Sequence, residues 1–364
     1  MDAQQKDRYS RQILFAPIGE AGQQRLLDSK AVLVGCGATG TAVANLLIRA
    51  GLGALRIIDR DFVEPSNLQR QTLFEESDAQ ENLPKAIAAK KRLRAINSGS
   101  QIEPVVTDLT PKNARDLLSN FPIILDGTDN FETRLLINDA AIALNVPWIY
   151  AAAVASTAVT MTIIPGETAC LACLLESADA ASVAEKNVAA SGANNNESAS
   201  EAAQQNDATC DTAGILSAAV NAITAIQSTE AIKLLINQRA ALHQRLISLD
   251  IWTNETRAIK VARNPNCRAC AQKNLRYLEG AAQPHITLCG RDSVQIHERN
   301  RSLNLQALHE ALAKTAIEVR SNPHLLRFQI NSYQVTVFPD GRAIIKGTRD
   351  PAIARTLYAR YIGS

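Results

Sequence analysis

The sequence predicts an α/β fold, a Rossmann-like and mostly parallel sheet with helices on both faces, followed by a small α+β domain. Between residues 30 and 165, short apolar runs alternate with helical stretches, which is typical of a parallel sheet covered on both sides. The first run is followed by Gly35, Gly37 and Gly40 in G-x-G-x-x-G spacing. Such a turn at the start of a helix lets the backbone approach phosphate groups closely.

The alternation predicts the individual elements of the first domain. We expect strands at 31–35, 55–59, about 102–106, 122–126 and 147–151, and helices near 39–51, 84–96, 111–119 and 132–145. Outside this region we expect a helical segment at 1–28, a β-rich segment at 154–164, a long helix from about 214 to 236 and a strand pair around 245–262.

Composition divides the rest of the chain. Residues 178–208 are rich in Ala, Ser, Asn, Gln and Glu, which cannot bury a core and predicts a mobile crossover loop. We therefore expect a first domain at 1–272, a linker at 273–284 and a small domain at 285–364. In that domain we expect strands at 285–297, 317–321, 325–330, 333–338 and 342–346, and helices at 304–315 and 350–361. Asp340-Gly341 predicts a hairpin turn.

Composition also narrows the class of protein. The 364 residues are 46% hydrophobic and 20% charged, with a formal net charge of +2. This balance favours a globular protein and gives no electrostatic reason to expect nucleic acid or a membrane as the main partner. The polar start of the chain does not look like a signal peptide, so we expect a cytoplasmic protein.

Two Cys-x-x-Cys pairs predict a metal site. Cys170 and Cys173 form one pair, Cys267 and Cys270 the other, and each follows a turn-prone segment. Four thiolates suit tetrahedral zinc, whereas a single pair alone would equally suggest a redox dithiol. Since four protein ligands leave no open position, we expect structural rather than catalytic Zn²⁺.

Asp59 ends the apolar run after the glycine turn, where a carboxylate accepts hydrogen bonds from ribose hydroxyls. Beyond it, the chain resembles the MoeB/ThiF/HesA family, the bacterial relatives of ubiquitin-activating enzymes. The resemblance covers roughly residues 5–272. Its motifs are Arg8-Tyr9-Ser10-Arg11-Gln12, the glycine turn, Asp59-Arg60-Asp61, Ser66-Asn67-Leu68-Gln69-Arg70-Gln71, Pro84-Lys85, Asp126-Gly127-Thr128-Asp129-Asn130 and both cysteine pairs.

The resemblance implies an adenylyltransferase that uses ATP and Mg²⁺. The C-terminal glycine carboxylate of a ubiquitin-like sulfur carrier of the MoaD or ThiS type attacks the α-phosphate, and pyrophosphate leaves. A sulfur donor, such as a cysteine desulfurase or a rhodanese, then converts the acyl-adenylate to a thiocarboxylate for molybdopterin or thiamine synthesis. The resemblance also implies a homodimer.

The same resemblance assigns roles to single residues. Arg70 and Lys85 would bind phosphates, with Asn67 helping to place them, and Arg11 would act on the nucleotide of the other subunit. Asp129 would hold Mg²⁺ or orient the phosphate, Asp59 would bind ribose, and Asp61 and Asn130 complete the nucleotide site. Cys210, just before the long helix, is a candidate for a covalent link to the carrier.

Each residue also has a plainer interpretation. Arg11 alone suggests an exposed helix residue, Lys85 a charge at a helix N-terminus, and Asp126 or Asp129 a helix cap. Three other functions stay open. A dehydrogenase would need a catalytic His, yet all five histidines lie at 243 or beyond. Relatives that adenylate a peptide C-terminus or a carboxylate on tRNA share the motifs, and so would a binding module without catalysis.

Overall fold

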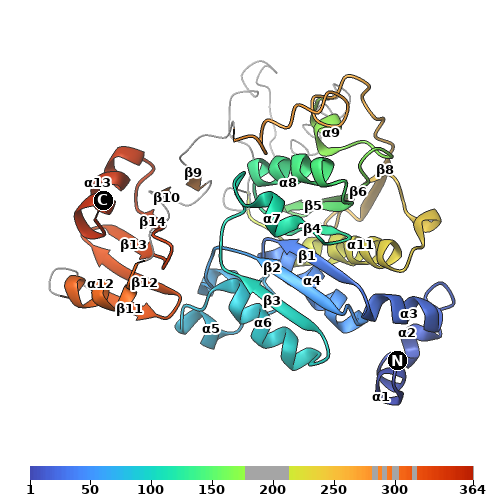
Figure 1. The fold of residues 1–364 in the computed structure, drawn as a ribbon, viewed down its shortest axis with the longest axis horizontal. Helices are drawn as coiled ribbons and strands as arrows, with labels where there is room; N and C mark the ends of the chain where they lie inside the picture. Colours follow the sequence, from blue (N-terminus) through green and yellow to red (C-terminus); the bar gives the residue numbers. More distant parts are fainter. Residues whose placement is uncertain (177–212, 281–285, 289–292, 297–302, 314–317, 364) are drawn as a thin grey trace. The chain divides into compact units, whose positions relative to one another are not determined.

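The structure is a computed structural model that describes residues 1–176, 213–280, 286–288, 293–296, 303–313 and 318–363. It forms two compact units, Met1–Ala281 and Ala282–Ser364 (Figure 1). Both Cys210 and the segment 178–208 lie outside the described residues. None of the described helices combines the length and the apolar character that crossing a membrane requires.

The first unit is built on an eight-stranded sheet that is parallel in one half and antiparallel in the other. Its order is β3 (Gln101–Val105), β2 (Ala54–Ile58), β1 (Lys30–Val34), β4 (Ile124–Asp126), β5 (Trp148–Val154), β6 (Thr157–Ile163), β7 (Leu246–Asp250) and β8 (Glu255–Ile259). Strands β3 to β5 pair in parallel, and β5 to β8 pair antiparallel. The change occurs at β5, because only Ala155 and Ser156 connect it to β6, and a parallel pair needs a long crossover.

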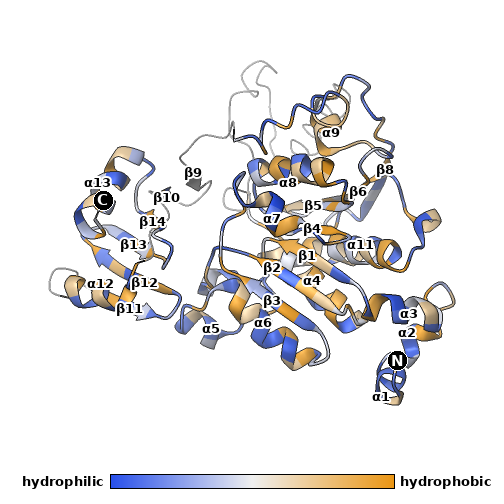
Figure 2. Ribbon diagram, viewed as in Figure 1, coloured by the Kyte–Doolittle hydropathy of each residue, from blue (hydrophilic) through white to orange (hydrophobic). Residues whose placement is uncertain are grey.

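Helices cover both faces of this sheet, as the alternation predicted. On β1, Val32 and Val34 belong to one hydrophobic core and Ala31 and Leu33 to the other. The first core includes residues of α7 (Ala114–Leu118) and α8 (Phe131–Leu144), and the second includes residues of α4 (Ala38–Ala50), α6 (Lys85–Ile96) and α11 (Ser217–Leu235). Hydrophobic residues dominate β1 accordingly (Figure 2). The expected fold class is confirmed.

The ends of the helices have local causes. Helix α4 starts after Gly37 and ends at Gly51, whose φ of +99° is a left-handed conformation that favours glycine. Helix α8 starts at Asn130 and ends at Asn145 in the same conformation. The shorter helices are α1 (Ala3–Arg8), α2 (Ser10–Ile13), α3 (Gly19–Leu27), η1 (Pro65–Asn67), α5 (Glu76–Gln80), α9 (Leu171–Glu176) and η3 (Arg239–Ala241).

The segment after the second cysteine pair packs on the first unit. Leu275 and Leu278 are buried in the core beside α8, and the Tyr277 N–H donates to Asp139 at 3.0 Å. The chain from 273 to 280, which the sequence suggested as a linker, is thus held by apolar burial and a buried hydrogen bond.

The second unit is an antiparallel sheet with two helices. Its order is β11 (Glu318–Asn322), β12 (Leu325–Ile330), β13 (Tyr333–Val337), β14 (Ala343–Lys346), β10 (Ser293–Ile296) and β9 (Ile286–Leu288). Residues of α12 (Leu305–Leu312) and α13 (Pro351–Tyr361) share its core. One expectation is wrong: the segment 285–297 is not one strand, because β9 pairs antiparallel with β10. Gly290, a turn-forming residue, lies between them.

Candidate active site

The predicted nucleotide residues gather at the carboxyl ends of three neighbouring parallel strands. The Gly35–Gly40 turn follows β1, Asp59 follows β2, and the segment 126–130 ends β4. Since β1 pairs with both β2 and β4, these three segments meet at one edge of the sheet. Ligands of open α/β sheets bind at this edge.

Three glycines hold the segments against each other. A Cβ added to Gly35 would lie 2.5 Å from the Gly127 carbonyl oxygen, and one added to Gly127 would lie 2.3 Å from the Gly35 oxygen. A Cβ on Gly40 would lie 2.1 Å from that same Gly35 oxygen. These distances exclude any side chain, so packing of the backbone requires glycine at all three positions.

Gly37 differs from these three. The nearest atoms to a Cβ at Gly37 are 3.9 and 4.0 Å away, and the second is Nε2 of Gln71. Close by in sequence, Asn67 Nδ2 and Gln71 Oε1 are buried without a hydrogen-bond partner. Unpaired buried polar atoms cost free energy. This space at the N-terminus of α4 therefore fits a polar, phosphate-bearing ligand.

We expect Gly37→Ala to weaken ATP binding by on the order of tenfold while leaving the stability of the free protein almost unchanged. The added methyl group would occupy the space that a phosphate needs, yet it contacts no protein atom closely. Calorimetric titration with ATP and thermal unfolding measure the two effects. Gly40→Ala is the matched control, and its clash with the Gly35 oxygen should lower the unfolding temperature. Unchanged ATP affinity in Gly37→Ala would contradict the assignment.

Asp59 is engaged with the glycine turn. Its two carboxylate oxygens accept hydrogen bonds from the N–H groups of Cys36, at 2.6 Å, and Asp61, at 2.7 Å. Burial raises the pKa of Asp59 to about 6, and the charge of Asp61 adds to the rise, while Lys85 and the two N–H groups oppose it. Asp59 thus changes its charge within the range where many enzymes are assayed.

We expect the affinity for adenosine to fall as the pH is lowered through about 6, because the ribose hydroxyls donate to the ionised Asp59. The stability of the free protein depends on pH in the opposite direction. The folded-state pKa lies above the unfolded value, so the contribution of Asp59 to stability is complete below pH 3.8 and is lost as the pH rises through about 6. Adenosine is the probe because it carries no phosphates of its own to titrate. An adenosine affinity that stays constant down to about pH 5 would contradict this role. So would an Asp59→Asn variant whose adenosine affinity depends on pH as strongly as that of the wild type.

Each of the three cations near the site has a protein partner. Lys85 Nζ lies 3.2 Å from Asp61 Oδ2, and the lysine side chain is only 5% exposed. Arg60 binds Asp108 at 2.8 Å. Arg70 is half-buried and donates to the Ser66 carbonyl at 2.8 Å. A nucleotide bound at these cations would compete with Asp61 for Lys85 and with the Ser66 carbonyl for Arg70.

Asp129 is exposed and does not cap helix α8. The cap is Asn130, whose side chain accepts from the Thr133 N–H at 2.8 Å. Asp126 does not cap the helix either: it is fully buried and binds Arg134 at 3.2 Å. Both interpretations of these acids as caps are therefore wrong. Burial lowers the pKa of Arg134, but Asp126, Tyr150 and Asp129 raise it above its usual value, which places Asp129 within electrostatic reach of that guanidinium.

Arg11 is far from the other site residues of its own chain. It is exposed on α2, and its neighbour Gln12 donates to the Ala50 carbonyl at 2.8 Å. Ala50 is the last residue of α4, whereas the glycine turn lies at the first. With 1.5 Å per residue the two ends are roughly 18 Å apart. The structure brings together the glycine turn, Asp59, Asp61 and Lys85, but not Arg11.

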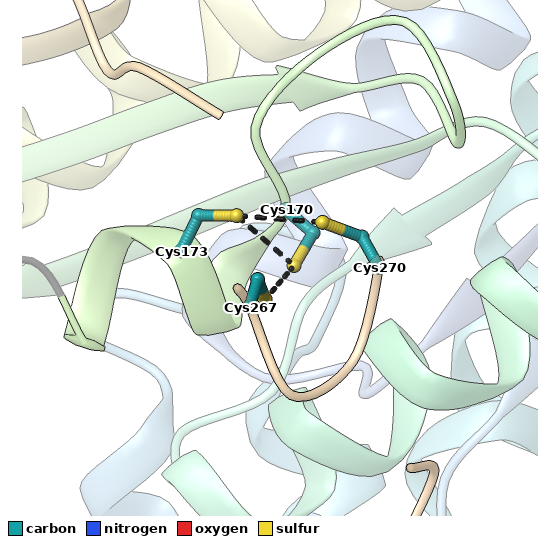
Figure 3. Close-up of side chains that lie close together, drawn as sticks. All are labelled: Cys170, Cys173, Cys267 and Cys270. Atoms are coloured by element: carbon teal, nitrogen blue, oxygen red, sulfur yellow. Dashed lines mark hydrogen bonds between the residues drawn. The ribbon is translucent and has the colours of Figure 1, made fainter. Parts of the chain in front are cut away.

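The four cysteines of the two pairs converge on one point (Figure 3). Their sulfur atoms all lie within 4.8 Å of one another, with close distances of 3.5 Å for Cys173–Cys270 and 3.6 Å for Cys170–Cys267. Tetrahedral zinc with bonds of ~2.3 Å places its ligands about 3.8 Å apart. A hydrogen bond from Cys170 lowers the pKa of Cys173 to about 4. A buried four-cysteine cluster with these sulfur distances fits Zn²⁺.

Several residues of the site had no role predicted from the sequence. Gln71 and Gly127 stand within the motifs but were assigned no function. The Arg134 guanidinium lies 5.4 Å from the centre of the Phe131 ring and 5.5 Å from that of Tyr150. The sequence contains a weak indication of the role of Arg134. It follows the strand-ending Asp126 by eight residues, which places it in the first turn of α8 and near that strand end. Its pairing with a buried acid depends on tertiary contacts.

Comparisons with known proteins agree with this geometry. The model of the ThiF family matches residues 9–269. The chain is 41% identical over 360 residues to the sulfur carrier protein ThiS adenylyltransferase of Bacillus subtilis, covering 98% of this chain and 99% of the relative. It is 32% identical to the molybdopterin-synthase adenylyltransferase of Escherichia coli, covering 73% of this chain and 96% of that protein.

Among solved structures, E. coli MccB with ATP superposes with a TM-score of 0.57 at 22% identity, covering 72% of this chain and 74% of that one. A likeness at this level of identity supports the fold alone. The alignment with the B. subtilis protein extends through the second unit, whereas the match to the family model ends within the first. On the length of the family match and the identity to these relatives, the chain belongs to the ThiF family.

Proposed function

We propose that the protein is an ATP-dependent adenylyltransferase that activates the C-terminal glycine carboxylate of a ubiquitin-like sulfur carrier. The observation that carries the proposal is the space at Gly37, which Gln71 borders, together with the buried atoms Asn67 Nδ2 and Gln71 Oε1 that have no hydrogen-bond partner. It lies at the strand ends that also present Asp59 and Asp129. A dehydrogenase is disfavoured because, within the described part of the chain, no histidine belongs to this group of residues.

The chemistry needs charge neutralisation more than covalent help. A carrier carboxylate oxygen attacks the α-phosphorus, the bond to the bridging oxygen breaks, and pyrophosphate leaves with the electron pair. Both reactants are anionic, so cations and N–H groups must stabilise the charge that develops. We assign this task to the N-terminus of α4, to Arg70 and to Lys85, which exchanges Asp61 for phosphate.

Two metals accompany this assignment. Asp129 and Asn130 are suited to hold Mg²⁺, a hard cation that prefers oxygen ligands and phosphates. The magnesium would neutralise phosphate charge. Zinc in the four-cysteine cluster has a complete set of protein ligands and would be structural.

The second half-reaction replaces AMP by sulfur. The outer sulfur of a persulfide-bearing donor attacks the acyl-adenylate, AMP leaves, and an acyl disulfide forms. A thiol then attacks the donor's sulfur in this disulfide, which releases the thiocarboxylate and leaves a disulfide between the thiol and the donor. We propose a cysteine desulfurase or a rhodanese as donor. Cys210 remains a candidate for a covalent link, and its position lies outside the described residues.

The test is ATP–pyrophosphate exchange with purified carriers. Exchange should depend on Mg²⁺ and on a ThiS-type or MoaD-type carrier with its terminal glycine, and a carrier that lacks this glycine is the control. Comparing the two carriers separates thiamine from molybdopterin synthesis. Exchange that needs no carrier, or none with either carrier, would overturn the proposal.

We further propose a homodimer in which Arg11 reaches the site of the partner subunit. Leu14 and Phe15 follow Arg11, and they are 74% and 60% exposed. Such apolar exposure beside an arginine that cannot reach its own glycine turn suits a subunit interface.

Complementation tests this arrangement. Arg11→Ala and Asp129→Ala should each be inactive alone, yet co-expressed chains should recover about one quarter of wild-type exchange, because half of the dimers are mixed and each has one intact site. Mass spectrometry verifies that mixed dimers form. Mixed dimers without activity would mean that Arg11 does not act across the interface.

A further inference from the structure

Two adjacent residues of helix α8 each hold one cysteine loop. Asn138 Oδ1 accepts the N–H of Leu171, inside the first Cys-x-x-Cys pair, at 2.9 Å. Asp139 accepts two hydrogen bonds from the guanidinium of Arg268, inside the second pair, both at 3.3 Å. Asn138 and Asp139 are completely buried. The two halves of the four-cysteine cluster are therefore fastened to neighbouring positions on the same helix.

The other end of this helix holds both neighbours of Asp129. Asn130 caps the helix through the Thr133 N–H at 2.8 Å. Arg134 donates to the Thr128 carbonyl at 2.6 Å and is buried. Asp129 itself is exposed, and its carboxylate accepts only a long contact of 3.4 Å from Asn130 among the hydrogen bonds of the described residues. The position of Asp129 therefore depends on how α8 holds Thr128 and Asn130, the residues on either side of it.

We propose that Asn138 and Asp139 are positioning residues that couple the four-cysteine cluster to Asp129 through α8. From Asn130 to Asp139 the helix extends roughly 14 Å, and a helix anchored at both ends moves as one body. The inference rests on the proposed role of Asp129 in adenylation.

The buried charge of Asp139 explains why disturbing the cysteine cluster would cost free energy at α8. Asp139 is 0% exposed and its partner Arg268 is 12% exposed. Truncating one partner of such a pair is costly because the other charge stays buried. If the second cysteine loop loses its order, Arg268 moves away and the buried Asp139 carboxylate loses its ion pair, keeping the N–H of Tyr277 from the segment that follows the same loop. Movement of α8 relieves this cost, and by linkage a ligand at Asp129 must then affect zinc release in return.

The experiment compares Asp139→Asn and Asn138→Ala with the wild-type full-length chain in its zinc-loaded form. Zinc release to a colorimetric chelator should become faster by roughly 10- to 100-fold, as for other residues that support metal ligands. Amide hydrogen exchange in residues 128–134 should rise while zinc is still bound. In pyrophosphate exchange, kcat should fall with little change in the KM for ATP.

Arg263→Ala is the matched control. Arg263 donates to the carbonyls of Gly166, at 2.8 Å, and Cys270, at 3.5 Å, so its hydrogen bonds among the described residues join the two cysteine segments and do not go to α8. This variant should also release zinc faster, but hydrogen exchange in 128–134 and kcat should stay at wild-type values while the zinc is bound.

The outcomes separate the two proposals. Unchanged hydrogen exchange in 128–134 in both α8 variants, with zinc release accelerated, would overturn the coupling. The milder Asn138→Ala keeps this test available if Asp139→Asn does not fold. If instead Asp129→Ala retains pyrophosphate exchange, the proposed function fails, whereas the hydrogen-exchange result still decides whether α8 connects the two places.

Discussion

Asp129→Ala is expected to lower carrier-dependent pyrophosphate exchange by roughly two to three orders of magnitude, the range seen when one preorganised charge-stabilising group is removed. Asp129 is exposed at the end of β4, within electrostatic reach of Arg134 and Arg60. It takes part in neither the helix cap nor a buried ion pair, so its loss should remove function and leave folding intact. The exchange assay, circular dichroism and thermal unfolding measure these effects.

Glu132→Ala provides the control for this prediction. Glu132 is also acidic and exposed, and it lies three residues further along in the first turn of α8. Its removal changes the net charge by the same amount near the same end of α8 but leaves the proposed site intact, so pyrophosphate exchange should stay near the wild-type rate. Near wild-type exchange in Asp129→Ala, or equal losses in both variants, would show that Asp129 has no specific role.

The second large effect concerns the four-cysteine cluster. Cys267→Ser should abolish stoichiometric zinc and lower the free energy of unfolding by on the order of 5 kcal/mol, because metal binding and folding are coupled in such sites. The four sulfurs form part of the core that also contains Leu171, Leu275 and Leu278. Helix α8 contributes to the same core, so losing the metal would loosen the packing of the cysteine segments against α8.

Elemental analysis and denaturant unfolding test this expectation. The freshly purified protein should contain about one zinc per chain. Cys36→Ala is the control, since Cys36 is a buried thiol in the other core and its loss should leave the zinc content unchanged. Wild-type protein without zinc, or a Cys267→Ser variant as stable as the wild type, would contradict the structural role.

The fold was predictable because strand and helix periods in this chain are regular. On β1, alternate residues enter different cores, which a run of Ala31-Val32-Leu33-Val34 already indicates. The sequence did not predict where the sheet changes from parallel to antiparallel, because this depends on the two-residue connection at Ala155 and Ser156. It also missed the break between β9 and β10, since one glycine in a β-rich segment suggests a turn only weakly.

The sequence predicted which residues form the candidate site, but not which hydrogen bonds and ion pairs they make. Local patterns did not reveal that Lys85 binds Asp61, that Asn130 rather than Asp129 caps α8, or that Arg134 pairs with Asp126. These pairings join residues on different elements, and the choice between neighbouring acids depends on how the strand end turns. The separation of Arg11 from the glycine turn likewise emerges only when α4 is seen in three dimensions.

The contacts among Gly35, Gly40 and Gly127 limit how this site can evolve or be redesigned. Because each of these residues excludes a side chain on another, none can be replaced without rebuilding the two loops together. A side chain at Gly37 fits the fold but would occupy the proposed phosphate space, so variation that keeps both is open only at other residues of the site. With Asp59 as the proposed ribose ligand, a change of nucleotide preference is most accessible around Asp59, while the Gly35–Gly40 turn stays the same.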